Sequence, residues 1–310
     1  MVLFVSTHPL ERAENLKAVY DAYQGEKKYA RLSPYLTCEA LKNSYDVIVT
    51  DEFLAEAHGK VIMINHACSG GKLFGIDQRY PYINKECCKL LDYVICTSEE
   101  TRMLTAHQCM VDKAKVLPFG MPRTDKLFEP VSSDKSRRVY LFCPTYRTRE
   151  EPPLMDIGYA RIDELLHDDE LLVVKHHPMT GSVGLKHYEH IIEISPELPT
   201  YPYLMSCDVL ITDYSSILFD AHVIRKPVVL FAYLNDVQDF LATRGMYYSY
   251  PSGYSSNYAA YEDELVNIIR NAKRRLLDED CRDRCCGACD GHSTERVIDL
   301  INSIVAGGKQ

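Results

Sequence analysis

The chain has 310 residues, of which 46% are hydrophobic and 25% are charged, and its formal net charge is -9. This composition is typical of a globular protein large enough for two domains, and it excludes a disordered or fibrous chain. The acidic balance gives no support to a broad footprint for nucleic acid, so we expect no nucleic acid partner.

Short apolar runs alternate with longer helical patterns along the whole chain. In the first half we predict strands at Val2–Ser6, Val47–Thr50, Val61–Asn65, Tyr93–Thr97 and Lys115–Leu117. In the second half we predict strands at Val139–Cys143, Leu171–Lys175, Ile191–Ile194, Val209–Thr212 and Val228–Phe231. Strands separated by helices are typical of a parallel sheet. The predicted fold class is therefore α/β with two Rossmann-like domains.

The segment from Pro118 to Arg138 is rich in proline and polar residues, which suits a connection between domains. We therefore place an N-terminal domain at 1–130 and a C-terminal domain at 131–292. Glu262–Leu277 and Thr294–Val305 have apolar residues at helical spacing. Residues 293–310 are predicted to form a C-terminal helix that packs back on the first domain.

Apolar runs such as Val61–Ile64 and Val228–Ala232 are far shorter than the roughly 20 residues that cross a bilayer. Met1–Val5 is not a basic segment followed by a long apolar core, so no secretory signal is expected. Most of the twelve cysteines lie in strand-like segments, where we expect reduced thiols. The chain is therefore predicted to be cytoplasmic.

The cysteine cluster near the C-terminus contains one ligand-like CxxC pair, followed by His292. A second pair at zinc-finger distance is missing, so a connection between helices is favoured over a zinc site. Zinc binding stays open for Cys281, Cys285, Cys286 and Cys289. GxGxxG, Walker, HExxH and GxSxG patterns are absent from the sequence, which disfavours NAD and leaves helix N-termini and placed side chains to recognise phosphate.

The most informative stretch is Asp208–Asp220, where an apolar strand leads into small hydroxyl residues and then a helical pattern. Open α/β sheets bind ligands at the carboxyl ends of their strands, and a helix start offers backbone N–H groups. A helix cap without function is the competing interpretation, because Asp and Ser are common capping residues. The candidate binding residues for a pyrophosphate are Thr212, Asp213, Ser215, Ser216 and Asp220.

A second candidate is Lys175–Pro178, which places a cation and two imidazoles directly after a buried-looking strand. Such groups neutralise phosphate charge as a nucleotide leaves. A single histidine is usually structural, but the location in the same half as the serine pair favours a functional role. The residues assigned to the site are Lys175, His177 and Pro178.

A third candidate is the glycine-containing loop His66–Lys72, which follows an apolar strand of the first half. His66 suits a general base toward an acceptor hydroxyl, and a histidine that only ends a strand is the alternative. Arginines beside turn residues suit phosphate, although surface ion pairs are their usual role. The further candidates for substrate binding are Lys72, Arg123, Thr145, Arg147 and Arg244.

Taken together and in this order, these motifs resemble the CDP-glycerol glycerophosphotransferase family. The resemblance runs from about residue 60 to the C-terminus and also includes Phe219, Gly245 and Asp290–Gly291. In the family pattern the first histidine is followed by Gly, Thr, Pro and Lys, whereas here the segment Ala67–Lys72 follows it. The identity of the acceptor therefore stays open.

The resemblance implies a GT-B-type arrangement with acceptor binding in the first domain and CDP-donor binding in the second. Glycerol phosphate, or a related polyol phosphate, would pass from a CDP-alcohol to a hydroxyl of a lipid-linked or glycan acceptor, releasing CMP, in teichoic-acid or capsule-type polymer synthesis. His66 would remove the proton while His177 and arginines balance the charge. No cofactor is built in, but a divalent cation such as Mg²⁺ would accompany the donor.

We also expect peripheral contact with the inner face of the plasma membrane, because the basic cluster Lys273–Arg275 suits anionic lipid. Two other classes of function remain as alternatives. One is a GT-B-like nucleotide-sugar glycosyltransferase or epimerase, and the other is a scaffold that binds a CDP-alcohol without turning it over. The polyol, the acceptor, the number of additions and the oligomeric state stay open.

Overall fold

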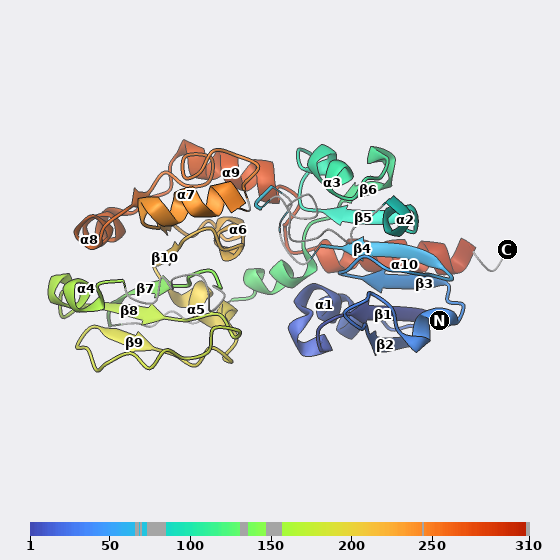
Figure 1. The fold of residues 1–310 in the computed structure, drawn as a ribbon, viewed down its shortest axis with the longest axis horizontal. Coiled ribbons are helices and arrows are strands. Elements are labelled where there is room, and N and C mark those ends of the chain that lie inside the picture. The colour runs from blue at the N-terminus through green and yellow to red at the C-terminus, as the bar shows by residue number, and fades with distance from the viewer. Residues whose placement is uncertain are drawn as a thin grey trace. The chain divides into compact units, whose positions relative to one another are not determined.

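The computed structural model describes residues 1–65, 68, 70–72, 85–130, 136–146, 157–243 and 245–307. Two compact units divide the chain: the first contains Met1–Phe128 and Asp283–Gln310, and the second contains Glu129–Arg282. Within the described residues, each unit has a six-stranded parallel sheet accompanied by helices (Figure 1). The predicted α/β class with two Rossmann-like parts is confirmed.

The first sheet has the spatial order β2-β1-β3-β4-β5-β6. Its strands are β1 (Val2–Ser6), β2 (Lys27–Arg31), β3 (Val47–Thr50), β4 (Lys60–Ile64), β5 (Tyr93–Cys96) and β6 (Val116–Pro118). The helices of this unit are α1 (Glu14–Ala22), α2 (Lys85–Lys89), α3 (Arg102–Gln108) and α10 (Ser293–Gly307). Short 3-10 turns are η1 (Leu10–Arg12), η2 (Glu39–Lys42), η3 (Lys113–Lys115) and η4 (Pro122–Phe128).

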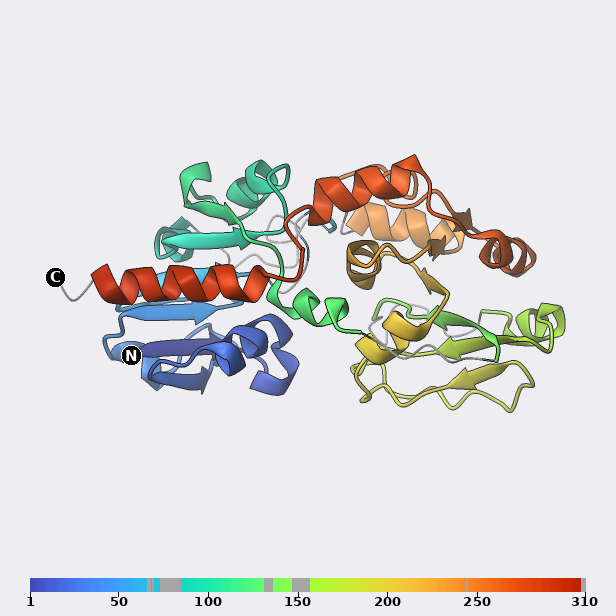
Figure 2. The ribbon, with the colours of Figure 1, turned by 180° about the vertical axis from the view of Figure 1, so that it is seen from behind.

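The strand β1 is buried along its whole length, as expected for a parallel strand covered on both faces. Successive side chains point to opposite faces, so Leu3 lies in one core and Phe4 in the other. The core that contains Phe4 also contains Val297 and Ile301 of α10. Figure 2 shows α10 running along this sheet. The last helix thus completes the core of the first unit.

The segment 283–292 also belongs to the first unit, although we assigned it to the second domain from the sequence. The helix α9 (Leu276–Cys286) runs across the boundary at Arg282. Its last cysteines and Cys289 are fully buried, so they take part in the interior of the first unit. The composition of residues 283–292, rich in glycine and polar residues, is typical of a loop and gave no indication of this burial.

The second sheet has the spatial order β12-β11-β10-β7-β8-β9. Its strands are β7 (Arg138–Phe142), β8 (Glu170–Val174), β9 (Ile191–Glu193), β10 (Val209–Thr212), β11 (Val228–Phe231) and β12 (Tyr258–Ala259). Besides the start of α9, the unit's helices are α4 (Tyr159–Leu165), α5 (Tyr201–Ser206), α6 (Ile217–Val223), α7 (Leu234–Thr243) and α8 (Glu262–Asn271). The segment Glu262–Leu277, in which we noted helical spacing, contains α8 and the start of α9, because α8 ends at Asn271 and α9 begins at Leu276.

Candidate functional site

Three neighbouring strands of the second sheet carry the predicted donor-binding segments at their carboxyl ends. The strands β10, β7 and β8 lie side by side and run parallel. Thr145 follows β7, Lys175–Pro178 follows β8, and Asp213–Ser216 follows β10. The carboxyl ends of parallel strands meet at one edge, which is where open α/β sheets bind ligands. The fold therefore brings these segments to the same edge of one sheet.

Asp213 connects two of these segments. Its side chain is fully buried and accepts hydrogen bonds from the backbone N–H of Thr145, at 3.0 and 3.1 Å to the two carboxylate oxygens. It also accepts from the Thr145 hydroxyl and from the backbone N–H of Ser215, the latter at 3.1 Å. One carboxylate thereby fixes the loop after β7 relative to the loop after β10.

The hydroxyl residues around Asp213 differ in what they offer a ligand. Thr212 is fully buried, and its hydroxyl donates to the carbonyl of Cys143 at 2.6 Å, so it holds β10 against β7. Ser215 and Ser216 are half-buried at the start of α6, while Asp220 is buried in its first turn. Ser215 and Ser216 are therefore the partly exposed hydroxyls of this stretch, whereas that of Thr212 is buried.

The His177 ring is exposed and oriented by two neighbours. Its Nδ1 accepts a hydrogen bond from the backbone N–H of Met179 at 3.1 Å, and its centroid lies 5.7 Å from that of the Tyr146 ring. Because Nδ1 serves as an acceptor, the neutral ring carries its proton on Nε2. His177 is therefore suited to donate a hydrogen bond to a phosphate oxygen.

The two residues before His177 are buried. The Lys175 side chain is 4% exposed, and its ammonium donates to the carbonyl of Pro196 at 2.9 Å. The His176 Nε2 atom lies 3.9 Å from a carboxylate oxygen of Glu193, and burial lowers the pKa of His176. The buried side chains of Lys175 and His176 thus hold the start of the loop after β8 in the interior. Pro178, further along this loop, is half-buried.

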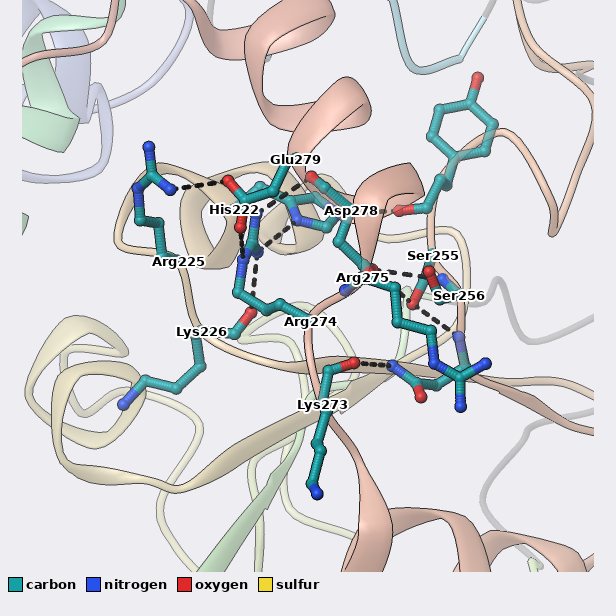
Figure 3. A network of polar contacts seen from close by, with 12 residues as sticks. His222, Arg225, Lys226, Ser255, Ser256, Lys273, Arg274, Arg275, Asp278 and Glu279 are labelled. Carbon is teal, nitrogen blue, oxygen red and sulfur yellow. Dashed lines mark hydrogen bonds and ion pairs between the residues drawn. The ribbon is translucent and has the colours of Figure 1, made fainter.

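The far end of α6 is anchored by a polar network (Figure 3). His222 is fully buried, with Nε2 at 2.8 Å from the carbonyl of Tyr254 and Nδ1 at 3.1 Å from the Arg274 guanidinium. A carbonyl only accepts and a guanidinium only donates, so His222 is the neutral Nε2–H tautomer. Burial lowers its pKa to about 4. The network fixes the helix that begins at the serine pair.

Arg274 belongs to this network and not to a free basic surface. It lies 2.8 Å from Glu279, which in turn pairs with Arg225 at 2.8 Å. The Arg274 side chain is only 12% exposed, whereas its neighbours Lys273 and Arg275 are exposed. Arg274, the middle residue of the predicted lipid-binding cluster, is therefore mostly buried in the second unit.

In the first unit, Arg123 and Lys72 are the predicted site residues that the structure describes. The Arg123 side chain is 13% exposed and lies 3.6 Å from Glu14. Its backbone N–H donates to Asn15 at 2.9 Å, and the Asn15 amide donates to the carbonyl of Asn65 at 2.9 Å. Arg123 is thereby tied to the end of β4, and Lys72 is half-buried.

Three predicted residues lie outside the described part of the chain. They are His66, Arg147 and Arg244. Asn65, directly before His66, lies among the described residues and follows β4.

Asp51, at the carboxyl edge of the first sheet, was missed by the sequence analysis. Its side chain is 3% exposed; Oδ2 accepts from the Ser6 hydroxyl at 3.1 Å, and Oδ1 has no hydrogen-bond partner among the described residues. Burial raises the pKa of Asp51 to about 7. The signal was present in the sequence, since Asp51 directly follows the predicted strand Val47–Thr50.

The twelve cysteines, all of them described, are reduced thiols, as predicted. The Sγ atoms of Cys68 and Cys286 lie 3.9 Å apart, and a hydrogen bond from Cys68 and burial raise the pKa of Cys286. Within the described residues, the group with spacing suited to a metal ion is Asp168, Glu189 and His190, and it contains no cysteine. None of the described helices is long and apolar enough to span a membrane.

Comparison with known proteins first defines the class of fold. A structure of the wall teichoic acid polymerase TagF matches with a TM-score of 0.77 at 18% identity, covering 100% of this chain and 90% of that one. A UDP-N-acetylglucosamine 2-epimerase from Listeria monocytogenes, described as putative in its own structure, matches with a TM-score of 0.63 at 12% identity, covering 99% and 97% of the two chains. The fold is thus the GT-B-like class of paired Rossmann-like units.

The family follows from the sequence comparison. Residues 23–303 match the model of CDP-Glycerol:Poly(glycerophosphate) glycerophosphotransferase, so the chain belongs to this family, as the motifs predicted. It is 25% identical to a teichoic acid poly(ribitol-phosphate) polymerase of Bacillus spizizenii, over 96% of this chain and 53% of that protein. It is 24% identical to a teichoic acid glycerol-phosphate primase of Bacillus subtilis, over 84% and 74%. The chain spans about half the length of the polymerase.

Proposed function

We propose that the chain transfers glycerol phosphate, or a related polyol phosphate, from a CDP-alcohol to a hydroxyl of a lipid-linked or glycan acceptor and releases CMP. The product would be a teichoic-acid or capsule-type polymer. Family membership gives the substrate class. The observation that carries the proposal is the edge of the second sheet, where Asp213 holds Thr145 and Ser215 beside the loop of His177.

The second unit binds the donor in this proposal. The hydroxyls of Ser215 and Ser216 meet the pyrophosphate, and His177 donates from Nε2 to a phosphate oxygen. Thr145 and Asp213 hold the loops around them, and buried Lys175 adds positive charge below. Thr212 and Asp220 support the strand end and the helix start. Pro178, Arg147 and Arg244 remain assigned to donor contacts on the family resemblance.

The transfer step moves one phosphoryl group. The acceptor oxygen forms a bond to the β-phosphorus, and the bond from that phosphorus to the bridging oxygen breaks, so its electron pair leaves with CMP. His66 takes the proton of the acceptor hydroxyl, while Lys72 and Arg123 of the first unit contact the acceptor. A divalent cation bound with the donor would neutralise phosphate oxygens.

A nucleotide-sugar epimerase or glycosyltransferase is the second candidate function. The likeness to the UDP-N-acetylglucosamine 2-epimerase favours it, although at 12% identity this likeness supports the fold alone. Incubation with CDP-glycerol, CDP-ribitol, and UDP- or CMP-sugars separates the two. CMP formed only from CDP-alcohols with acceptor present supports the proposal, and turnover of a sugar nucleotide alone contradicts it. Binding without any turnover would indicate a scaffold.

The roles of the two histidines are tested by His66→Asn and His177→Gln, each checked for folding by its melting curve. General-base assistance typically contributes roughly 10²–10⁴ in rate, so His66→Asn should lose that much CMP release while donor affinity changes little. His177→Gln should weaken donor affinity as well, since its contact exists before transfer. Near-normal turnover in His66→Asn would show that His66 is not the general base.

We further propose that the protein works in the cytoplasm at the inner face of the plasma membrane. The exposed Lys273 and Arg275, directly before α9, are cations that anionic lipid could contact. High salt should then release the protein from membranes. A requirement for detergent would contradict peripheral attachment through these charges.

A further inference from the structure

A group of metal-ligand side chains lies at the amino edge of the second sheet, opposite the proposed donor site. Asp168 precedes β8, and Glu189 and His190 precede β9, which pairs with β8 in parallel. One ligand atom from each of the three residues lies within 4.8 Å of the other two. We propose that Asp168, Glu189 and His190 form a structural site for a divalent transition-metal ion, with Zn²⁺ the ion that this ligand set fits best.

His190 is the observation that separates this group from an ordinary acidic surface. Its side chain is 7% exposed, and its Nδ1 atom has no hydrogen-bond partner among the described residues. A buried nitrogen without a partner is costly to the fold, and a cation bound through Nδ1 would relieve that cost. The carboxylates of Asp168 and Glu189 are exposed, so an ion in solution can reach them.

The backbone around two of the ligands is fixed by a further carboxylate. Asp163 of α4 accepts hydrogen bonds from the backbone N–H of His190 at 2.7 Å and of Glu189 at 3.2 Å. The carbonyl of His190 accepts from the backbone N–H of Leu172 on β8 at 2.8 Å. Both sides of the His190 backbone are therefore held, which orients the imidazole before any ion arrives.

The turn that carries Asp168 is held in a similar way. The backbone N–H of Glu170 donates to the carbonyl of His167 at 2.8 Å, and the backbone N–H of His167 donates to the Glu170 carboxylate at 2.9 Å. Zinc binds nitrogen and carboxylate oxygen at about 2.0–2.2 Å, which places tetrahedral ligands about 3.4 Å apart. The ligand atoms now lie within 4.8 Å of one another, so rotation of the two exposed carboxylates would have to close the difference.

The mixed ligand set selects the metal. Carboxylates alone suit Mg²⁺ and Ca²⁺, whereas an imidazole nitrogen shifts the preference to Zn²⁺ and its transition-metal neighbours. Water would complete the coordination. The ion would join the turn before β8 to the start of β9, which is the edge strand of this sheet. A metal here stabilises the sheet edge and takes no part in transfer.

The test compares metal binding in matched pairs of variants. Zn²⁺ binding to the full chain is measured by calorimetry and by thermal shift for the wild type, Asp168→Asn, Glu189→Gln and His190→Asn. Two controls carry the same changes at exposed neighbours: Asp169→Asn and His187→Asn. Co²⁺ absorption distinguishes this site from the cysteines, because thiolate ligands give sulfur-to-metal charge-transfer bands and nitrogen or oxygen ligands do not.

We expect Zn²⁺ to raise the wild-type melting temperature, and each ligand variant to bind it at least about 10-fold more weakly than the wild type. Both controls should stay within about 2-fold of the wild type, and Co²⁺ should bind without charge-transfer bands. Asp168→Asn and Glu189→Gln alter exposed side chains, so they decide the matter even if His190→Asn fails to fold. No saturable binding, equal losses in the controls, or binding only through thiolates would overturn the proposal.

Discussion

The carboxyl edge of each sheet contains a buried aspartate, and the two aspartates differ in the hydrogen bonds that they accept. Asp213 of the second sheet accepts hydrogen bonds from Thr145 and Ser215. Asp51 of the first sheet accepts from the Ser6 hydroxyl, and burial raises its pKa to about 7. Ionised carboxylates are stable in protein interiors only when hydrogen bonds or charges replace water. The second edge thus contains a carboxyl with several hydrogen-bond donors around it, and the first contains a carboxyl whose pKa is raised by burial.

The largest expected effect concerns Asp213 and its matched residue Asp208 at the other end of β10. Asp208 accepts from the backbone N–H of Val139 at 2.8 Å, so both aspartates join β10 to β7. Asp213→Asn should reduce CMP release about 100-fold, because the loops that present Ser215 lose their common acceptor. Asp208→Asn should lower stability by about 1 kcal/mol and leave turnover within a few-fold.

Steady-state CMP release and urea unfolding of both variants provide the measurement. Equal loss of turnover in Asp208→Asn would show that strand pairing alone, and not the arrangement of the carboxyl edge, limits the reaction.

A second effect contrasts Asp51 of the first unit with His222 of the second. The pKa of Asp51 is raised from 3.8 to about 7, so between these pH values the unfolded chain loses a proton that the folded chain keeps. Stability from Asp51 therefore falls as pH rises. The pKa of His222 is lowered from 6.5 to about 4, so its contribution is lost as pH falls through this range. The two pH dependences oppose each other, each on the order of 3–4 kcal/mol.

Urea unfolding at pH 4.5, 5.5, 6.5 and 7.5 separates these contributions. Relative to the wild type, Asp51→Asn should gain stability as pH rises, whereas His222→Gln should lose it. The wild-type profile should be flatter than that of either variant. Parallel profiles for the wild type and both variants would contradict the contrast between the two buried groups.

The smallest effect concerns the hydrogen bond between the Ser6 hydroxyl and Asp51. The Ser6 hydroxyl lowers the pKa of Asp51 against the larger effect of burial, so Ser6→Ala should raise that pKa further. Loss of this hydrogen bond should cost about 1 kcal/mol near pH 8, where Asp51 is ionised, and less near pH 5. Carboxyl carbon NMR across a pH titration measures the shift directly. A lower pKa in Ser6→Ala would mean that another group controls Asp51.

The sequence predicted the central strands well because burial on both faces leaves continuous apolar runs. The predicted bounds of Val2–Ser6, Val47–Thr50, Val209–Thr212 and Val228–Phe231 agree with β1, β3, β10 and β11. The two strands that it missed lie at sheet edges. β2 reads Lys-Lys-Tyr-Ala-Arg, and β12 has two residues, so neither has an apolar pattern to detect. Their pairing depends on the neighbouring strand and not on their own sequence.

The sequence predicted where the candidate site lies better than it predicted what each side chain contacts. Strand order brings the loops after β7, β8 and β10 together, and the motifs marked each loop. The Lys175 ammonium donates to the carbonyl of Pro196, and this contact depends on packing that the spacing of residues in the sequence does not reveal. The same holds for Arg274, which we expected at the surface because it lies between Lys273 and Arg275 in the sequence. The position of Asp51 directly after the predicted strand Val47–Thr50 was visible in the sequence, but its burial depends on packing that the sequence pattern does not show.

The return of α10 to the first unit has a consequence for the order in which the protein is made. Val297 and Ile301 belong to the core around Phe4, yet they leave the ribosome after the whole of Glu129–Arg282. The part synthesised first therefore waits for the last helix, while the second unit already holds all of its own strands. Protease treatment of chains stalled shortly after Arg282 has emerged should thus find the second unit resistant and residues 1–128 still open to cleavage.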